Sequence, residues 1–266
     1  MNASRFATCQ NVLRNEDMAS DLDILVEAGV RQVGVLGALA QKTGIAETAK
    51  LLRERRLSAC SYIPGLQVLQ ADPHAADRGL RDGLNAAAAL GAPYLTVGTG
   101  SAGSLSGAQA DERYVACLER AAPLARELGV RMAIEPIHPL LRLVGHVNTI
   151  RHAAELAARV DGVGIVFDCV HLFWDRDLSA DIERHIERVC SVQLSNVDPQ
   201  AIAEKRWARC PLDEGLVPVA QLVRMLEAAG FRGVYEDETL MPRPRAECIE
   251  GVRAARLWFV ALGGIN

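Results

Sequence analysis

One stretch decides the fold: Gly164-Ile165-Val166-Phe167-Asp168, an apolar run that closes on an acid and is followed three residues later by His171. A short run of this kind, rich in β-branched and aromatic side chains, is typical of a buried strand in a parallel sheet. Catalytic groups in parallel α/β folds gather at the carboxyl ends of the strands, so the acid and the histidine indicate a functional site. Three similar endings suggest a shared metal ion: Met132-Ala133-Ile134-Glu135, Ser191-Val192-Gln193 and Val234-Tyr235-Glu236-Asp237-Glu238.

Strand-type runs alternate with amphipathic helical segments along the whole chain. The helical segments place apolar residues at i, i+3 and i+4, as in Leu22, Leu25 and Val26, which predicts one face packed on a sheet. Eight such alternations predict a single domain over 1–266, an α/β protein folded as one (β/α)8 TIM barrel. The strands are expected at 5–9, 31–35, 57–63, 93–97, 131–135, 163–168, 190–195 and 233–238.

Glycines mark the predicted helix ends and favour the barrel over its alternative. Gly29, Gly91, Gly129 and Gly230 each stand shortly before a strand, where a helix commonly ends. A doubly wound sheet is the weaker alternative because no fingerprint glycine loop is present. The glycine-rich segment 98–104 lacks both the G-x-G-x-x-G frame and the GK[ST] ending, so we expect a loop rather than a phosphate-binding cradle.

Length, charge and cysteine usage limit the function classes. With 266 residues the chain can bury the core of one large domain. A formal net charge of −4 gives no general attraction to nucleic acid, and no run of about twenty apolar residues predicts a membrane span. The seven cysteines form no CxxC pair, which favours free thiols in a reducing compartment. We therefore expect a cytoplasmic protein without nucleic-acid or membrane partners.

Four oxygen-bearing side chains are predicted to meet at one rim of the barrel: Glu135, Asp168, Gln193 and Glu238. Three carboxylates and an amide oxygen are hard ligands, which suit Mn²⁺, Mg²⁺ or Co²⁺ better than Zn²⁺. Three carboxylates held close together would repel one another without a cation. On the last strand, Glu236 and Glu238 share a face, so the residues themselves leave open which of them is the ligand.

Histidines accompany two of these strand endings. His171 follows Asp168 and could reach a substrate hydroxyl, and His138 stands in the same relation to Glu135, although either could be a packing residue. His152 and His185 are expected on the surface, and the positions of His74 and His146 are left open.

The polar loop after the seventh strand, 198–215, carries Lys205, Arg206 and Arg209. These cations could bind a phosphate or carboxylate of a substrate, with arginine the better bidentate partner, or could form a solvated loop. Trp174 and Trp207 near the same rim could form a wall of the pocket or serve as packing residues.

At these residues the chain resembles the xylose isomerase-like TIM-barrel superfamily of sugar phosphate isomerases and epimerases, over nearly its whole length. The relatives include D-tagatose 3-epimerase, inosose dehydratase and 3-dehydroshikimate dehydratase. The matching phrases are Glu135-Pro136-Ile137-His138, Asp168-Cys169-Val170-His171, Val192-Gln193-Leu194-Ser195-Asn196, Gly230-Phe231-Arg232-Gly233 ending on Glu238, and Arg209-Cys210-Pro211-Leu212-Asp213-Glu214-Gly215.

The resemblance implies a role for each matching residue. Glu135, Asp168, Gln193 and Glu238 would hold a divalent ion, with Glu135 and Glu238 also exchanging protons with the substrate. The family spacing favours Glu238 over Glu236 on the last strand. Substrate contacts would come from His138, His171, Trp174 and Arg209. Two departures bear on the reaction: Gln193 replaces the histidine usual in sugar epimerases, and Pro199 stands where those enzymes carry an arginine.

The leading hypothesis is a metal-dependent isomerase or epimerase of a sugar, a sugar phosphate or a keto-polyol, acting through an enediolate. The first alternative is a dehydratase of 3-dehydroshikimate or inosose type, which Gln193 favours. A second is a non-catalytic carbohydrate-binding barrel. The endonuclease IV branch of the superfamily is disfavoured, because the predicted rim is poor in histidine and the chain carries little positive charge. The resemblance also allows a homo-oligomer.

Overall fold

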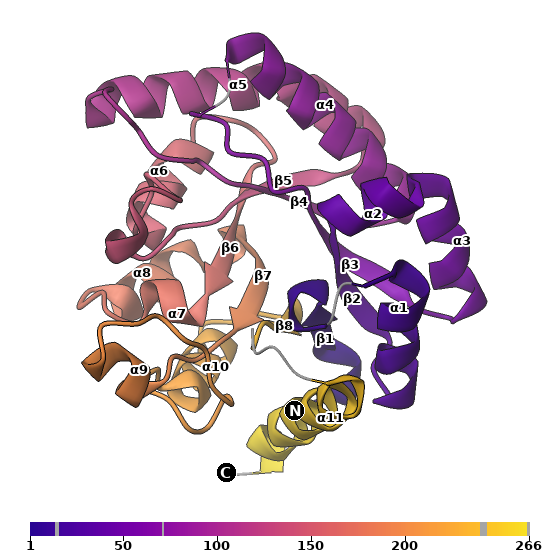
Figure 1. The fold of residues 1–266 in the computed structure, drawn as a ribbon. Helices are drawn as coiled ribbons and strands as arrows, with labels where there is room; N and C mark the ends of the chain where they lie inside the picture. Colours follow the sequence, from indigo (N-terminus) through magenta and orange to yellow (C-terminus); the bar gives the residue numbers. More distant parts are fainter. Residues whose placement is uncertain (14–15, 71, 240–243, 265–266) are drawn as a thin grey trace.

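The computed structural model describes residues 1–13, 16–70, 72–239 and 244–264, and its centre is a closed barrel of parallel strands (Figure 1). Each strand pairs with the next along the chain, and β8 pairs with β1, which closes the barrel. The strands are β1 Phe6–Cys9, β2 Gln32–Leu36, β3 Ser58–Ile63, β4 Tyr94–Val97, β5 Arg131–Ile134, β6 Gly164–Asp168, β7 Val189–Leu194 and β8 Val234–Asp237.

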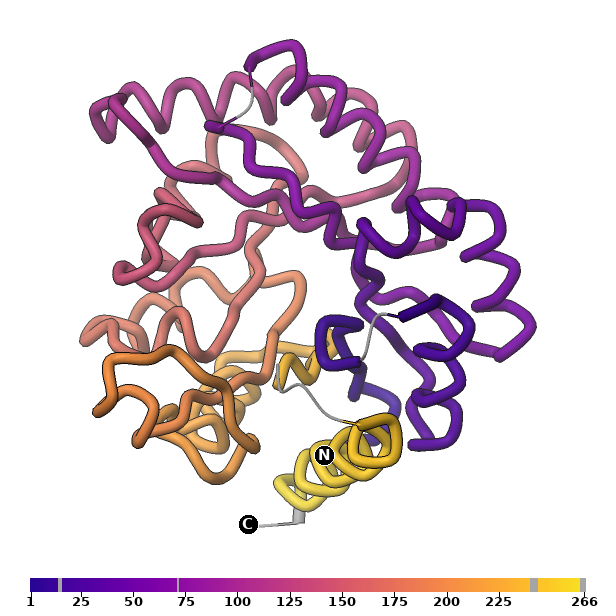
Figure 2. Tube along the Cα trace, viewed as in Figure 1, coloured from indigo at the N-terminus to yellow at the C-terminus, as the bar shows by residue number. Residues whose placement is uncertain are grey.

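Helices surround the barrel (Figure 1). They are α1 Met18–Glu27, α2 Gly37–Thr43, α3 Ile45–Glu54, α4 Pro73–Leu90, α5 Gly107–Leu128, α6 Ile150–Ala157, α7 Cys169–Leu172, α8 Leu178–His185, α9 Pro199–Ala203, α10 Val219–Ala228 and α11 Arg245–Ala261. Short 3-10 helices lie at Ala3–Arg5, Gln10–Val12, Pro139–Leu141, Ile186–Arg188 and Leu262–Gly264. The N-terminus lies against α11, where the Met1 ammonium donates to the Val260 carbonyl at 2.6 Å (Figure 2).

The predicted TIM barrel is confirmed, and all eight predicted strands form with ends that differ by at most one residue. Sequential pairing around a closed ring rules out the doubly wound alternative. Two of the predicted helix ends show why a glycine stands there. Gly91 and Gly129 adopt φ of 70° and 66°, a left-handed conformation that glycine enters without a Cβ clash.

The apolar stripes of the helices pack on the outside of the barrel, as the periodicity predicts. Leu22 and Leu25 of α1 are fully buried, as is Leu226 of α10. Burial of side chains of this size contributes roughly 1.5–3 kcal/mol each. No helix within the described ranges is long and apolar enough to cross a membrane. The seven cysteines are all buried and form no disulfide with one another, as expected.

The glycine-rich segment after β4 packs tightly against two other loops. Val68 N–H donates to the Gly98 carbonyl at 3.1 Å, and Gly100 forms a parallel bridge with Gly145. A Cβ on Gly98 would lie 2.7 Å from the Leu66 carbonyl oxygen, so glycine is required here by the close approach of the backbone. The segment therefore joins the β3–α4 loop to the β5–α6 loop.

One acid is held inside the barrel. Glu236 is 1% exposed, and its two carboxyl oxygens accept hydrogen bonds from Ser191 Oγ at 2.8 Å and Ser61 Oγ at 3.0 Å. Gly34 leaves the space that it occupies, because a Cβ there would lie 2.1 Å from Glu236 Oε2. Burial raises the pKa of Glu236, although the serine hydroxyls oppose the rise.

We predict that Glu236→Gln gains stability relative to the wild type as the pH rises. The folded protein holds the Glu236 proton more tightly than the unfolded chain, so the wild type loses this contribution above the unfolded pKa of about 4.3. A glutamine cannot ionise and keeps the serine contacts. The difference in free energy of unfolding between the two proteins should widen from pH 5 to pH 8 in urea titrations. The matched exposed change Glu119→Gln should show no such trend, and a pH-independent difference for Glu236→Gln would contradict the prediction.

Candidate functional site

The carboxyl end of the barrel brings the predicted residues of the last four strands together. Asp168 ends β6 and stands in register with Gln193 of β7, so both side chains point to the same side of the sheet. Glu135 directly follows β5, and Glu238 directly follows β8. The backbone N–H of Glu238 donates to the Leu194 carbonyl at 2.8 Å, which continues the pairing with β7.

Two of the acids and one histidine lie within reach of a single ion. Glu135, Asp168 and His171 each offer a ligand atom, and these atoms all lie within 4.8 Å of one another. Asp168 is fully buried, and Gln193 and Glu238 are 2% and 7% exposed. Deep burial of this many oxygen-bearing side chains is unusual unless they are paired or bind a cation.

Asp168 is the best-supported carboxylate of the cluster. Its Oδ1 accepts hydrogen bonds from Val170 N–H at 2.8 Å and from the Ser195 hydroxyl. Its Oδ2 faces His171 Nε2 at 3.6 Å and Arg209 Nη2 at 3.7 Å. Burial alone would raise the pKa of Asp168, but His171, Arg209 and the two hydrogen bonds outweigh it and leave the pKa below its usual range.

Two buried acceptors in the cluster have no donor. Asp168 Oδ2 and Gln193 Oε1 are shielded from solvent and accept no hydrogen bond from the described residues. Such groups are costly in a folded protein and call for an explanation, commonly a bound ion or water. A divalent cation at this position would satisfy both oxygens, so the donor set fits a metal.

Glu135 and Glu238 bind protons tightly. Burial raises the pKa of Glu135 to about 8, with a further rise from the Asp168 charge and a smaller opposing effect of Arg209. Burial also raises the pKa of Glu238 well above its usual range, and Asp168 and Glu135 add to the rise. The same two conditions, little water and neighbouring negative charge, favour a cation over a proton when a cation is present.

The structure places Glu236 and Glu238, the two candidate ligands on the last strand, at different depths in the barrel. Both face inward, as predicted, but Glu236 lies inside the barrel with its two oxygens occupied by serines. Glu238 lies at the carboxyl end, where Oε1 accepts from Asn11 Nδ2 at 3.0 Å. Glu238 is not part of the group of ligand atoms formed by Glu135, Asp168 and His171, although the charges of Asp168 and Glu135 act on its pKa.

Arg209 reaches the cluster from the loop after β7. It is buried, and its Nη1 makes no hydrogen bond to the described residues. The side chain of Asn196 fixes this loop: its Oδ1 accepts from the backbone N–H groups of Val197 and Val217, and its Nδ2 donates to the carbonyls of Leu212 and Val217. Arg206, by contrast, is exposed and pairs with Glu204, as expected if this part of the loop is solvated.

Aromatic rings line one side of the cluster. The His138 ring lies 6.0 Å from Trp174 and 5.3 Å from Trp207, centroid to centroid. Burial lowers the pKa of His138, which favours the neutral ring at pH 7. Its Nδ1 accepts from Leu140 N–H at 3.2 Å, so Nε2 carries the proton and can donate. The Trp174 indole donates to the His171 carbonyl at 2.8 Å, which joins the aromatic side to the acid cluster.

Two polar residues of the site escaped the sequence analysis. Asn11 donates to Glu238, and Ser195 donates to Asp168. Asn11 lies two residues after the end of the first strand, so a search for polar residues near strand ends would have found it. Ser195 lies two residues beyond Gln193, on the same side of a continued strand. His152 also differs from the surface position expected for it, because it is half-buried and contacts Asp111.

A (β/α)8 barrel with acids clustered at the carboxyl ends of its strands defines the class of this protein. Residues 22–258 match the family model described as xylose isomerase-like TIM barrel, and the chain belongs to this family. The resemblance inferred from the motifs is thereby confirmed. A search of the curated proteins finds no match.

Solved structures share the barrel at low sequence identity. The chain is similar to a D-allulose 3-epimerase from Methylomonas sp. (16% identity, 97% of each chain, TM-score 0.79). It is also similar to the IOLI protein with a binding zinc atom (15%, 97% of each chain, 0.79). A third similar structure is the probable 3-DHS dehydratase AsbF from Bacillus anthracis (14%, 96% of this chain and 98% of that chain, 0.76). At these identities the likeness concerns the fold.

We predict that divalent metal uptake releases a proton from Glu135. With a pKa of about 8 the metal-free carboxyl is mostly protonated at pH 7, and an ion must displace that proton. Apparent Mn²⁺ affinity should therefore rise with pH, about tenfold per unit below pH 8 for each proton released. Calorimetric titration in two buffers of different ionisation heat measures the proton count. Identical heats in both buffers would contradict the prediction, and Glu135→Gln should lower the count.

We predict that Asn196→Ala destabilises the protein and loosens the loop that carries Arg209. The change removes four hydrogen bonds and leaves three backbone groups without a partner, since the Val217 carbonyl still accepts from Val219 N–H; one such loss costs about 1–3 kcal/mol. Urea unfolding should show a loss of at least this size. Asn85→Ala is the matched control, because Asn85 is exposed on α4 and binds only the carbonyl of its own helix at Arg81. Equal stability of the two variants would show that the loop does not depend on Asn196.

Proposed function

We propose that this protein is a divalent-metal-dependent isomerase or epimerase that acts on a sugar, a sugar phosphate or a keto-polyol. The carrying observation is that two acids of the site, the half-buried Glu135 and the buried Glu238, both have a raised pKa, whereas the pKa of Asp168 is lowered. A carboxyl whose pKa is near the working pH can both accept and return a proton efficiently. Membership of the xylose isomerase-like family supports an enzyme of this kind.

The metal would be held by Glu135, Asp168, Gln193 and Glu238. The unpartnered oxygens of Asp168 and Gln193 support this assignment. Oxygen ligands favour Mn²⁺ or Mg²⁺, and the imidazole of His171 in the same cluster extends the range to Co²⁺, with Zn²⁺ less favoured. When bound, the ion supplies positive charge beside the two adjacent oxygens of the substrate, which lowers the free energy of the enediolate.

The residues of the chain would perform the proton transfers and position the substrate. Glu135 and Glu238 would remove and return the proton on the carbon beside the carbonyl. His171 and His138 would orient substrate hydroxyls, with the Nε2–H of His138 as a donor. Arg209, buried and with an unused Nη1, would bind the distal oxygens of the substrate. Trp174 would cover one side of the sugar and restrict water.

A dehydratase of 3-dehydroshikimate or inosose type is the alternative, and Gln193 favours it. Such an enzyme uses the same proton abstraction and then expels a β-hydroxyl. The substrate that the protein accepts and the product that it forms distinguish the two reactions. In either case the partner is a small carbohydrate-like molecule, in keeping with the net charge of −4.

We predict that Glu135→Gln and Glu238→Gln each abolish proton exchange. The purified protein, loaded with Mn²⁺, Mg²⁺ or Co²⁺, is incubated in D₂O with ketoses, ketose phosphates, inosose and 3-dehydroshikimate. Deuterium should enter at a carbon beside the carbonyl, and each variant should lower the rate by roughly 10²–10⁴-fold, the usual contribution of a general acid or base.

Glu119→Gln, an exposed change on α5, is the control and should leave the exchange rate unchanged. Exchange that persists in both active-site variants would overturn the assignment. A dehydrated product would place the protein among the dehydratases. Binding of sugars without any exchange would favour the non-catalytic barrel.

A further inference from the structure

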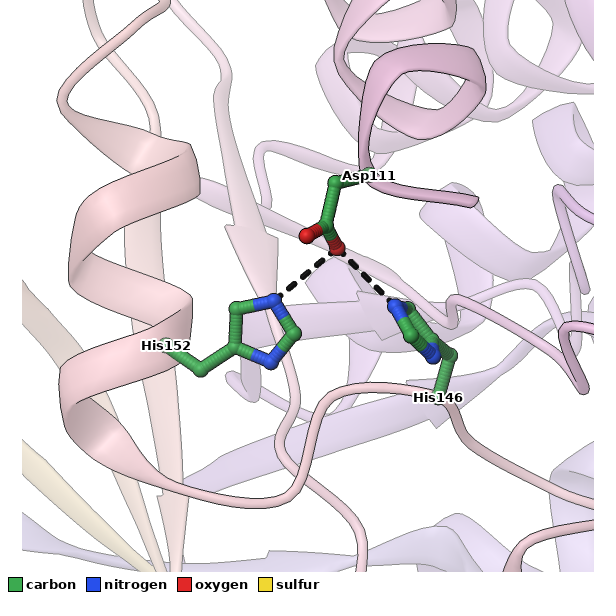
Figure 3. Close-up of side chains that lie close together, drawn as sticks. All are labelled: Asp111, His146 and His152. Carbon is green, nitrogen blue, oxygen red and sulfur yellow. Dashed lines mark hydrogen bonds and ion pairs between the residues drawn. The ribbon is translucent and has the colours of Figure 1, made fainter. Parts of the chain in front are cut away.

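A second group of potential metal ligands lies apart from the acid cluster. Asp111 Oδ1 is 2.9 Å from His146 Nε2 and 2.9 Å from His152 Nε2 (Figure 3). The three residues come from the N-terminal part of α5, the β5–α6 loop and the first turn of α6. None of them belongs to the group formed by Glu135, Asp168 and His171.

The backbone holds both histidines in place. The N–H of His146 donates to Thr99 Oγ1 at 2.9 Å, and Thr99 itself is fully buried. The N–H of His152 donates at 3.1 Å to Thr149 Oγ1, which caps α6. The Gly100–Gly145 bridge fixes the chain just before His146. The three side chains are therefore positioned by the fold before any ligand arrives.

The geometry is close to that of a divalent metal site. Ligands at about 2.0–2.1 Å from a tetrahedral zinc ion lie roughly 3.3 Å apart. The two oxygen–nitrogen distances are a few tenths of an ångström shorter, and the three ligand atoms all lie within 4.8 Å of one another. The side chains of Asp111, His146 and His152 are 26%, 11% and 28% exposed, so an ion can enter and water can complete its coordination.

The chemistry of the ligands selects the ion. Two imidazole nitrogens and one carboxylate favour Zn²⁺ and the neighbouring transition metals, whereas Mg²⁺ and Ca²⁺ prefer oxygen ligands alone. We propose that Asp111, His146 and His152 form a second metal site, which takes Zn²⁺ or a similar divalent transition ion. The ion ties α5 and α6 to the β5–α6 loop, and that loop also carries Glu135 and His138. The site is thus a structural clamp beside the barrel mouth.

The test is zinc stoichiometry and thermal stability of the full chain, without an affinity tag and stripped with a chelator. A rim variant, Glu135→Gln with Asp168→Asn, removes both carboxylates of the Glu135–Asp168–His171 group and so separates the second site from the rim. We expect this variant to bind one equivalent of Zn²⁺. Free Zn²⁺ at about 100 times its Kd should raise Tm by roughly 5–10 °C. Mg²⁺ at the same concentration should give no such rise. Co²⁺ bound to this variant should show visible absorption bands of a low-coordinate site.

Adding His146→Gln and His152→Gln to the rim variant should remove the zinc equivalent, the Tm rise and the cobalt bands. His74→Gln with His185→Gln is the matched control, because His74 is exposed and His185 half-buried, and neither belongs to the group; it should change none of them. Asp111→Asn keeps a hydrogen-bond acceptor for both rings but removes the carboxylate, so it should weaken zinc binding at least tenfold. This variant distinguishes a lost ligand from a folding defect. A rim variant that binds no zinc, or zinc binding unchanged by the histidine substitutions, would overturn the proposal and leave a hydrogen-bonded cluster alone. Either result is independent of the proton-exchange assay.

Discussion

The site depends on one constraint: its negatively charged carboxylates lie where little water can solvate them. Asp168 stays ionised because Ser195, Val170 N–H, His171 and Arg209 all face it. Burial and, after it, the charge of Asp168 raise the pKa of Glu135 and Glu238, which have fewer partners. Affinity for a cation and the capacity to hold a proton thus arise from the same arrangement, since both relieve the same excess of negative charge in a place with little water.

Hydrogen bonds hold the loops that surround this cluster in place. Arg209 belongs to a loop that is held by four hydrogen bonds of the Asn196 side chain and by a backbone bridge between Val197 and Arg209. The β5–α6 loop, whose His138 ring lies 5.3 Å from Trp207 of the loop after β7, is held by the Gly100–Gly145 bridge and by the bond from His146 N–H to Thr99. Loops are ordinarily the mobile part of a barrel, and here side-chain hydrogen bonds to backbone groups restrict them where the candidate site needs precision.

Much of the fold and part of the site could be predicted from local patterns. The strands near Asp168 and Gln193 formed where the apolar runs lay, because a buried parallel strand has a recognisable composition and ends at a polar residue. The choice between Glu236 and Glu238 could not be made from the residues themselves. It depends on serines from other strands, Ser61 and Ser191, which hold Glu236 inside the barrel.

The sequence by itself determined the alternation of strands and helices, the barrel, and the three acids and one glutamine near the ends of its last four strands, because period and composition are properties of short segments. Only the tertiary structure decided which atoms lack partners, such as Asp168 Oδ2 and Gln193 Oε1, and which distant side chains meet, such as Asn11 with Glu238. Closure of the barrel joins the first strand to the last, and this joining brings together groups separated by more than two hundred positions. No local pattern encodes such a contact, since it arises from the packing of the whole ring.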